Sequence, residues 1–254
     1  MSLFMKDWKK VNMDNYKYTE EENYEDIEFR SNLDLKISNS NASNWAYTLA
    51  NKNTEEVSKK IYVISIIKKS KLQVGDEIIS IDDKSFENVL EYKNYLNSIT
   101  SDSVIVQVKR NNKYKDIKVK VTKEKDGVYL GVLLDVLTEY KTNPEIDINF
   151  KQEESGPSAG VITTLYIYDL LNDYDLSKGR KIAGTGTIEE DGSIGEIGEI
   201  KYKFLGAVKD GSDIFIAPSG KNYNTCMKLK EKRKLKIKVI EAKNIKDVIN
   251  QLEK

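Results

Sequence analysis

The residues whose types and spacing best suit chemistry lie in one short stretch of the second half of the chain. The sequence Gly-Pro-Ser-Ala-Gly at 156–160 precedes an apolar run at 161–171. Small neighbours leave the Ser158 hydroxyl uncovered where a helix is expected to begin. The first backbone N–H groups of a helix lack partners within it, so they can stabilise an anion that forms beside the serine. Serine is also a common helix cap, so this stretch alone leaves both roles open.

The absence of histidine limits what could activate such a serine. With no histidine in the chain, Ser-His-Asp catalysis, Cys-His catalysis and histidine-bound zinc are excluded. The single cysteine, Cys226, excludes an internal disulfide and a cysteine-ligated metal site. We therefore expect no metal and no cofactor.

A lysine can act as the base if it is neutral. The reference pKa of lysine is about 10.4, and burial can lower it by several units. Lys201 follows Ile-Gly-Glu-Ile and opens an expected helix. The partial positive charge of a helix start also disfavours the ammonium form. Lys201 is thus the candidate general base.

Alternating strands and helices are expected to position these residues in an α/β domain. Glycines inside the strand-like segment 182–188 are typical of close backbone approach or of a site. Asp-Gly at 191–192 predicts a hairpin turn. Further strands are expected at 128–136, 146–150, 213–218 and 237–241, and helices at 158–171, 201–208, 223–233 and 245–252.

The first half of the chain predicts a smaller, β-rich domain. Residues 1–30 are polar and indicate an arm. Alternation of apolar and polar residues predicts a strand over 29–37, and 45–49 predicts a short helix. A helix is expected over Asn88–Ile99. An Asn-Asn hairpin turn is expected at 111–112, between two of the strands. Strands are expected at 61–67, 78–81, 104–108 and 117–121.

This order resembles that of a PDZ domain. The resemblance rests on Leu-x-Val-Gly-Asp-x-Ile at 72–78 and on the strand and helix that follow. PDZ domains bind an extended peptide as an added strand beside a helix. The resemblance implies a groove between 61–67 and 88–99, faced by Val63, Ser65 and Tyr92. The alternative is that these residues form only a small core. No Gly-Leu-Gly-Phe type carboxylate loop precedes Ile61, so recognition of a free C-terminus is not implied.

Three motifs of the second half resemble the proteolytic domain of Lon-type serine proteases. They are Gly-Pro-Ser-Ala-Gly at 156–160, Gly-Thr-Gly at 184–186 and Gly-x-Ile-Gly-x-Ile-Lys at 195–201, in the family's order. The stretch 175–188 is similar to one branch, the bacterial PDZ-containing Lon-like proteases. These are usually membrane-anchored with an extracytoplasmic catalytic part.

The resemblance implies a role for each matching residue. Ser158 would be the nucleophile and Lys201 its base, at a separation that fits the family, and Thr185 would hold the lysine amine. Backbone groups of Gly156, Pro157 and Ser158 would form the oxyanion hole. Ser155 stands where many Lon proteases carry an acidic residue.

The expected protein is a serine endopeptidase with a Ser-Lys dyad and a PDZ domain that recruits substrate. We expect a mixed fold, α+β and α/β, divided into an arm (1–30), a PDZ-like domain (31–125) and a Lon-type domain (126–254). No Gly-x-x-x-x-Gly-Lys-Ser/Thr loop is present, so ATP-independent cleavage of peptides or unfolded segments is expected. The alternative is a peptide-binding module with a latent or inactive protease domain.

The expected partners are protein or peptide substrates, and a homo-oligomer formed through the Lon-type domain is possible. Basic and acidic residues balance at 41 each, which argues against a nucleic-acid partner. No apolar run approaches the roughly 18 to 20 residues of a membrane helix. We expect the chain itself to be soluble. The family resemblance implies an extracytoplasmic protein whose anchor has been removed; otherwise it is cytoplasmic.

Overall fold

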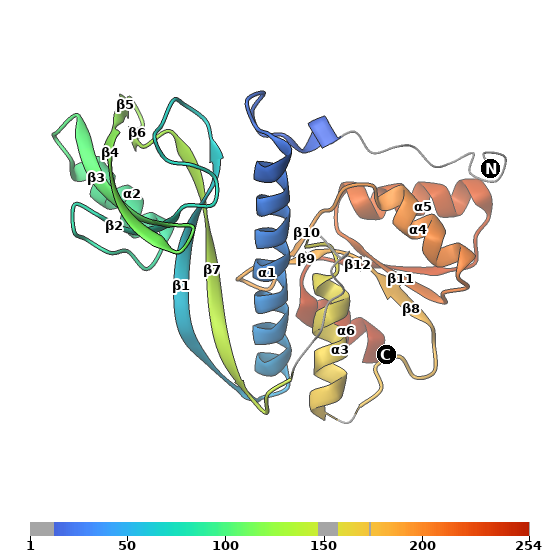
Figure 1. Cartoon of the computed structure of the whole chain (residues 1–254). Coiled ribbons are helices and arrows are strands. Elements are labelled where there is room, and N and C mark those ends of the chain that lie inside the picture. The colour runs from blue at the N-terminus through green and yellow to red at the C-terminus, as the bar shows by residue number, and fades with distance from the viewer. Residues whose placement is uncertain (1–12, 147–156, 173, 254) are drawn as a thin grey trace. The chain divides into compact units, whose positions relative to one another are not determined.

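The computed structural model describes residues 13–146, 157–172 and 174–253 (Figure 1). The chain divides into two compact units. The β unit comprises Asn12–Leu33 and Glu56–Glu139, and the α/β unit comprises Asp34–Glu55 and Tyr140–Lys254. The division differs from the linear order of domains expected from the sequence, because residues 34–55 group with the second half of the chain.

The long helix α1 (Tyr24–Leu49) corrects two predictions, the strand over 29–37 and the arm that reaches residue 30. Asn23 begins the helix, since its side chain accepts from the Asp26 N–H at 3.0 Å while Asp26 accepts from the Asn23 N–H at 3.1 Å. Asn51, with a φ of 54°, follows its end. Most of the buried positions are three or four residues from another one, which is helical spacing. They are Ile27, Arg30, Leu33, Ser38, Asn41, Ala42, Ala46 and Tyr47.

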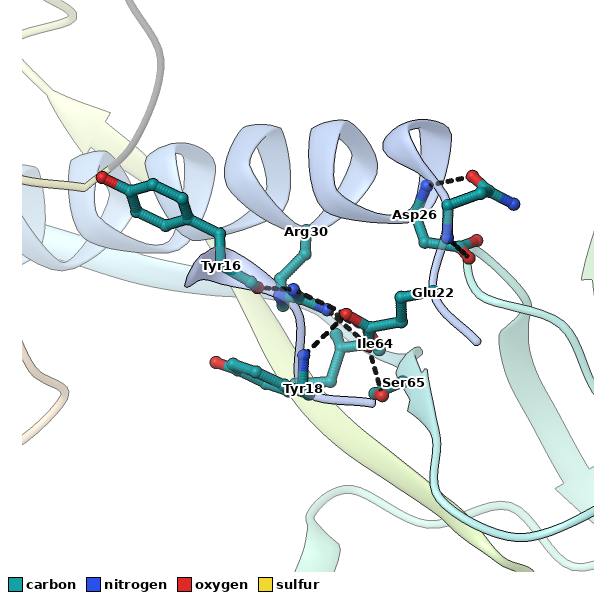
Figure 2. Close-up of polar contacts among 8 residues, drawn as sticks. Tyr16, Tyr18, Glu22, Asp26, Arg30, Ile64 and Ser65 are labelled. Atoms are coloured by element: carbon teal, nitrogen blue, oxygen red, sulfur yellow. Dashed lines mark hydrogen bonds and ion pairs between the residues drawn. The ribbon is translucent and has the colours of Figure 1, made fainter. Parts of the chain in front are cut away.

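The first turns of α1 are fixed in the β unit by a buried ion pair (Figure 2). Arg30 donates to both carboxylate oxygens of Glu22, at 2.9 and 3.0 Å, and to the carbonyl of Ile64 at 3.2 Å. Glu22 also accepts from the Ser65 hydroxyl at 2.5 Å and from the Tyr18 N–H at 2.8 Å. Burial opposes ionisation of Glu22, but these hydrogen bonds outweigh it and lower its pKa. A buried charge is tolerated when it is paired and hydrogen-bonded in this way.

The β unit contains a five-stranded sheet in the order β4-β3-β2-β1-β7. Asn88 caps helix α2 by accepting from the Glu91 N–H. The strands and helix expected between 61 and 121 are confirmed, and Asn111 and Asn112 form the β3–β4 turn with positive φ. The elements are β1 (Asn53–Ile66), β2 (Glu77–Ile81), α2 (Val89–Ser98), β3 (Ser103–Arg110), β4 (Lys113–Lys120) and β7 (Val132–Asn143). A short 3₁₀ helix (Met13–Tyr16) precedes α1.

The strand predicted over 128–136 is interrupted in the structure. It is divided between β6 (Gly127–Tyr129), which pairs with β5 (Thr122–Glu124), and β7. Gly131 lies between β6 and β7 with a φ of 73°, a conformation that favours glycine. The chain therefore turns at Gly131 before it enters the large sheet.

The α/β unit is organised around a parallel sheet in the order β12-β11-β8. The elements are α3 (Gly160–Asn172), β8 (Ile182–Gly184), β9 (Thr187–Ile188), β10 (Ile194–Gly195), α4 (Ile200–Lys209), β11 (Ile214–Pro218), α5 (Lys221–Arg233), β12 (Lys238–Ala242) and α6 (Ile245–Glu253). Strand β11 is buried at every position. Ile214 and Ile216 join a core with α3 and α6, whereas Phe215 and Ala217 join a core with α4 and α5. Helices thus cover both faces of the sheet, which confirms the α/β prediction.

Part of the predicted site region lies outside the described residues. These are four positions of the strand expected at 146–150, together with Ser155 and Gly156. Within the described part of the chain, no helix is both long enough and apolar enough to cross a membrane.

Candidate active site

Ser158 lies in the turn immediately before α3 and is half-buried. Its carbonyl accepts from the Gly186 N–H and from the Thr185 hydroxyl, each at 2.9 Å. The Val161 N–H donates in turn to the Gly186 carbonyl at 3.2 Å. A Cβ on Gly186 would lie 2.7 Å from Ile194 and 2.9 Å from Val161, so only glycine allows this approach. The Gly-Thr-Gly segment therefore holds the serine turn from one side.

The lysine that donates to the Ser158 hydroxyl is Lys203, two residues after the expected Lys201. Its Nζ donates to Ser158 Oγ at 2.8 Å. Residues two apart on an α-helix lie about 200° apart around the axis, so Lys201 and Lys203 point to nearly opposite sides of α4. Lys201 Nζ lies 5.3 Å from the ring centroid of Tyr202. The motif spacing favours the first lysine of Lys-Tyr-Lys, whereas the phase of the helix directs the second one to Ser158.

The surroundings of Lys203 favour a neutral amine. Lys203 remains exposed as a whole residue. Around its amino group, desolvation by the protein lowers its pKa. It also lies in the first turn of α4, where the helix dipole disfavours added positive charge. A lysine within hydrogen-bond distance of a serine, with a lowered pKa, has both the geometry and the chemistry of a general base.

Thr185 contacts the backbone of Ser158, through a different hydrogen bond from the one expected. The resemblance to Lon-type proteases implied a hydrogen bond to the amine of Lys201. In the structure the buried Thr185 hydroxyl donates to the Ser158 carbonyl, and its N–H donates to Ile216 at 3.1 Å. Thr185 therefore links the backbone of the serine turn to the parallel sheet.

Elementary chemistry reduces the number of residues that could donate to the oxyanion in the hole expected from Gly156, Pro157 and Ser158. Gly156 lies outside the described residues. Proline has no N–H, so Pro157 cannot donate. The carbonyl of Pro157 accepts from the Ser38 hydroxyl at 2.9 Å and from the Gly160 N–H at 3.2 Å. Of the two described residues, only Ser158 can supply an N–H, and this role stays a prediction.

Asn222 holds the segment that leads into α4 by hydrogen bonds. The sequence did not predict this contact. The Ile197 N–H donates to Asn222 Oδ1 at 2.8 Å, and Asn222 Nδ2 donates to the Ile197 carbonyl at 3.1 Å. The Asn222 N–H donates to Glu196 at 3.0 Å. Asn222 is buried at the start of α5. A lone asparagine in a polar segment gave no sequence signal, since the contact forms only on folding.

Among the described residues, Cys226 and the carboxylates give no sign of a second reactive site. Cys226 belongs to the core under β11, where burial raises its pKa to about 12. In the part of the chain that the structure describes, no group of three or more cysteine or carboxylate side chains could hold a metal ion.

Two family models match the chain. The Lon protease (S16) C-terminal proteolytic domain matches residues 148–253, and the PDZ domain matches residues 37–121. The chain combines a PDZ domain with a Lon-type serine protease domain. The Lon-type match contains Ser158, Thr185 and Lys203, and the PDZ match contains β2, α2, β3 and β4.

Two solved structures that are similar to part of the chain are PDZ domains of Listeria proteins. One, from an SdrC-like protein of Listeria innocua, is 30% identical, with 30% of this chain and 92% of that chain covered and a TM-score of 0.27. Another, from an SdrC-like protein of Listeria monocytogenes, is 26% identical, with 32% and 92% covered and a TM-score of 0.29. No curated protein matches the chain.

Within the PDZ domain, the expected peptide groove is not on β1. Strand β1 lies between β2 and β7, so it has neighbours on both sides and offers no edge to an added strand. Val63 and Ser65 are fully buried and Tyr92 is 7% exposed. Ser65 donates to Glu22, as described above. These three residues are therefore core residues, which was the alternative left open by the sequence.

Proposed function

We propose that the chain is a serine endopeptidase in which Ser158 is the nucleophile and Lys203 its general base. The observation that carries this proposal is the 2.8 Å hydrogen bond between Lys203 Nζ and Ser158 Oγ. The lowered pKa of Lys203 supports it.

The proposed reaction is acyl transfer in two halves. Neutral Lys203 accepts the Ser158 hydroxyl proton as Oγ attacks the peptide carbonyl. The resulting oxyanion is stabilised by backbone N–H groups, that of Ser158 among them. Lys203 then gives the proton to the leaving amine, which departs and leaves an acyl-serine. Water attacks the ester with Lys203 again as base, and releases the carboxylic acid and free Ser158.

The chain is proposed to cleave peptides or unfolded segments without ATP, because its sequence has no phosphate-binding loop. We place substrate recruitment by the PDZ domain on β7 rather than β1. Strand β7 is an edge strand of the sheet and follows the turn at Gly131. Its residues Val132 and Leu134 pack against the core that α2 also joins. An extended peptide added to an edge strand gains backbone hydrogen bonds.

Substitution of the two lysines tests the choice of base. We expect Ser158→Ala and Lys203→Ala each to reduce casein cleavage at least 10³-fold, the order seen when a nucleophile or its base is removed. Lys201→Ala is the matched control, since it removes a lysine two residues away on the same helix. It should keep most of the activity. Full activity in Lys203→Ala, or its loss in Lys201→Ala alone, would reject the assignment.

A latent protease domain is the second candidate function, and a serine-directed probe distinguishes it. Wild-type chain should be labelled at Ser158 by a fluorophosphonate, and Ser158→Ala should not. Failure of labelling together with peptide binding by the PDZ domain would favour a binding protein over an enzyme.

A further inference from the structure

Helix α1 contributes a row of polar side chains to the Lon-type domain. Ser38, Asn41 and Trp45 are spaced by three and four residues and so share one face of the helix. Each donates to a backbone carbonyl beside the site. Ser38 donates to Pro157 at 2.9 Å, Asn41 to Ile188 at 2.9 Å and Trp45 to Glu190 at 3.1 Å. These donors precede the Lon-type match, which begins at residue 148.

The Ser38 side chain is buried and packs tightly against the serine turn. Ser38 is 2% exposed. A Cβ on Gly160 would lie 2.5 Å from Ser38 Oγ and 2.9 Å from the Ile188 backbone nitrogen. Glycine costs about 1 kcal/mol relative to alanine within a helix, so its position at the start of α3 needs a compensating reason. The absence of a side chain on Gly160 lets the Ser38 hydroxyl approach the turn.

The peptide group that Ser38 contacts is the one that ends at the nucleophile. The Pro157 carbonyl and the Ser158 N–H belong to a single planar unit, and in a trans peptide they point in opposite directions. A hydrogen bond that fixes the carbonyl therefore also fixes the direction of the N–H. Hydrogen bonding to the carbonyl polarises the same group, which makes its N–H a stronger donor.

We propose that Ser38 is a positioning residue that orients the Pro157–Ser158 peptide group, so that the Ser158 N–H points at the oxyanion. This inference rests on the proposed function, since it needs Ser158 to form an acyl-enzyme. Ser38 itself touches neither substrate nor reacting atoms. Its effect belongs to the transition state, because the oxyanion forms only there.

Steady-state kinetics on a fluorogenic peptide test the proposal. Ser38→Ala should lower kcat about 10- to 100-fold, less than the loss of an oxyanion donor itself, with KM within about twofold. Ser38→Thr, which keeps the hydroxyl, should restore kcat. Thr48→Ala is the matched control: its hydroxyl donates within α1 to Asn44, and its kcat should equal that of wild type.

Inhibition by a peptide aldehyde adds a readout that a purely structural role would not change. The aldehyde forms a tetrahedral adduct with an oxyanion, so Ser38→Ala should weaken its inhibition by a factor similar to the loss in kcat. An unchanged kcat in a folded Ser38→Ala, or a loss confined to KM, overturns the inference. If Ser38→Ala does not fold, Ser38→Cys replaces it, with a weaker donor of similar size and an intermediate kcat expected.

Failure of the proposed function would look different. Activity that survives in Ser158→Ala would reject the nucleophile, and the role of Ser38 with it. An inactive Ser158→Ala beside a fully active Ser38→Ala would reject only the role of Ser38.

Discussion

At the scale of single residues, the proposed site depends on the protonation state of Lys203. Desolvation lowers its pKa, so the amine loses its proton at a lower pH than an ordinary lysine does. As a base it works only when neutral. Below this pKa the ammonium form is inactive, and above it the base is fully available.

The expected pH dependence of cleavage follows from the lowered pKa of Lys203 and from its need to be neutral as a base. We expect kcat/KM to rise with pH and to reach a plateau, with an apparent pKa below the usual value of about 10.4 for lysine. The measurement is a pH profile of kcat/KM, with thermal unfolding followed over the same range to exclude loss of fold. Lys203→Arg should be inactive at every pH, because arginine stays protonated. A profile that falls as pH rises would contradict the role of Lys203.

At the scale of elements, the position of Lys203 depends on how α4 begins. Glu199, the residue before the helix, has a φ of 56°, and its side chain makes no capping hydrogen bond. The preceding Ile197 is instead held from α5 by both atoms of the Asn222 amide. Asn222 thus does for this segment what a cap normally does for a helix start.

Replacement of Asn222 should affect both stability and rate. Asn222→Ala leaves the N–H and carbonyl of Ile197 without these partners in a partly buried place, which costs about 1–3 kcal/mol for each unsatisfied group. We expect a lower urea midpoint and, because α4 can shift, a lower kcat. Asn224→Ala is the matched control, an exposed asparagine on the same helix. Equal midpoints for the two variants would show that the amide contacts contribute little.

At the scale of the whole molecule, the α/β unit is assembled from two separated parts of the sequence. Residues 34–55 precede the PDZ strands, yet they group with residues 140–254. Ala42 is fully buried in the core that also contains Val161 of α3. Ala46 and Tyr47 are fully buried in a second cluster with Ile167. The second half of α1 is therefore part of the hydrophobic core of the Lon-type domain.

Excision of the Lon-type domain at its sequence boundary tests this arrangement. A fragment of residues 126–254 lacks α1 and exposes the apolar surface that Ala42, Ala46 and Tyr47 cover. We expect it to bind a hydrophobic dye, to be digested rapidly by trypsin and to lack peptidase activity. A fragment that unfolds as cooperatively as the full chain and keeps its activity would show that α1 is dispensable. The full chain with Ser158→Ala serves as the folded, inactive reference.

Local sequence patterns were sufficient to predict much of the secondary structure of this protein and one of its candidate site residues. The strands and α2 of the PDZ domain, the alternating elements of the Lon-type domain and the proposed nucleophile Ser158 all follow from patterns within a few residues. Side-chain periodicity and turn residues act over that range. The same kind of local pattern gave a wrong prediction within Tyr24–Leu49. Four apolar residues between 29 and 37 fit a strand, whereas the buried positions over the whole segment fit a helix.

The features that local patterns did not predict depend on contacts between residues distant in sequence. Motif spacing located the proposed base to within one helical turn, but only the rotation of α4 against the serine turn brought Lys203, rather than Lys201, to Ser158. The order of strands in the sheet, not the strand patterns, made β1 internal and buried Val63 and Ser65. Ser38 and Asn222 gave no local signal, since hydrogen bonds to Pro157 and Ile197 exist only after the chain has folded. The sequence by itself determined the chemistry available to this protein, and the tertiary structure decided which side chains meet, because direction and distance between remote segments are set by packing.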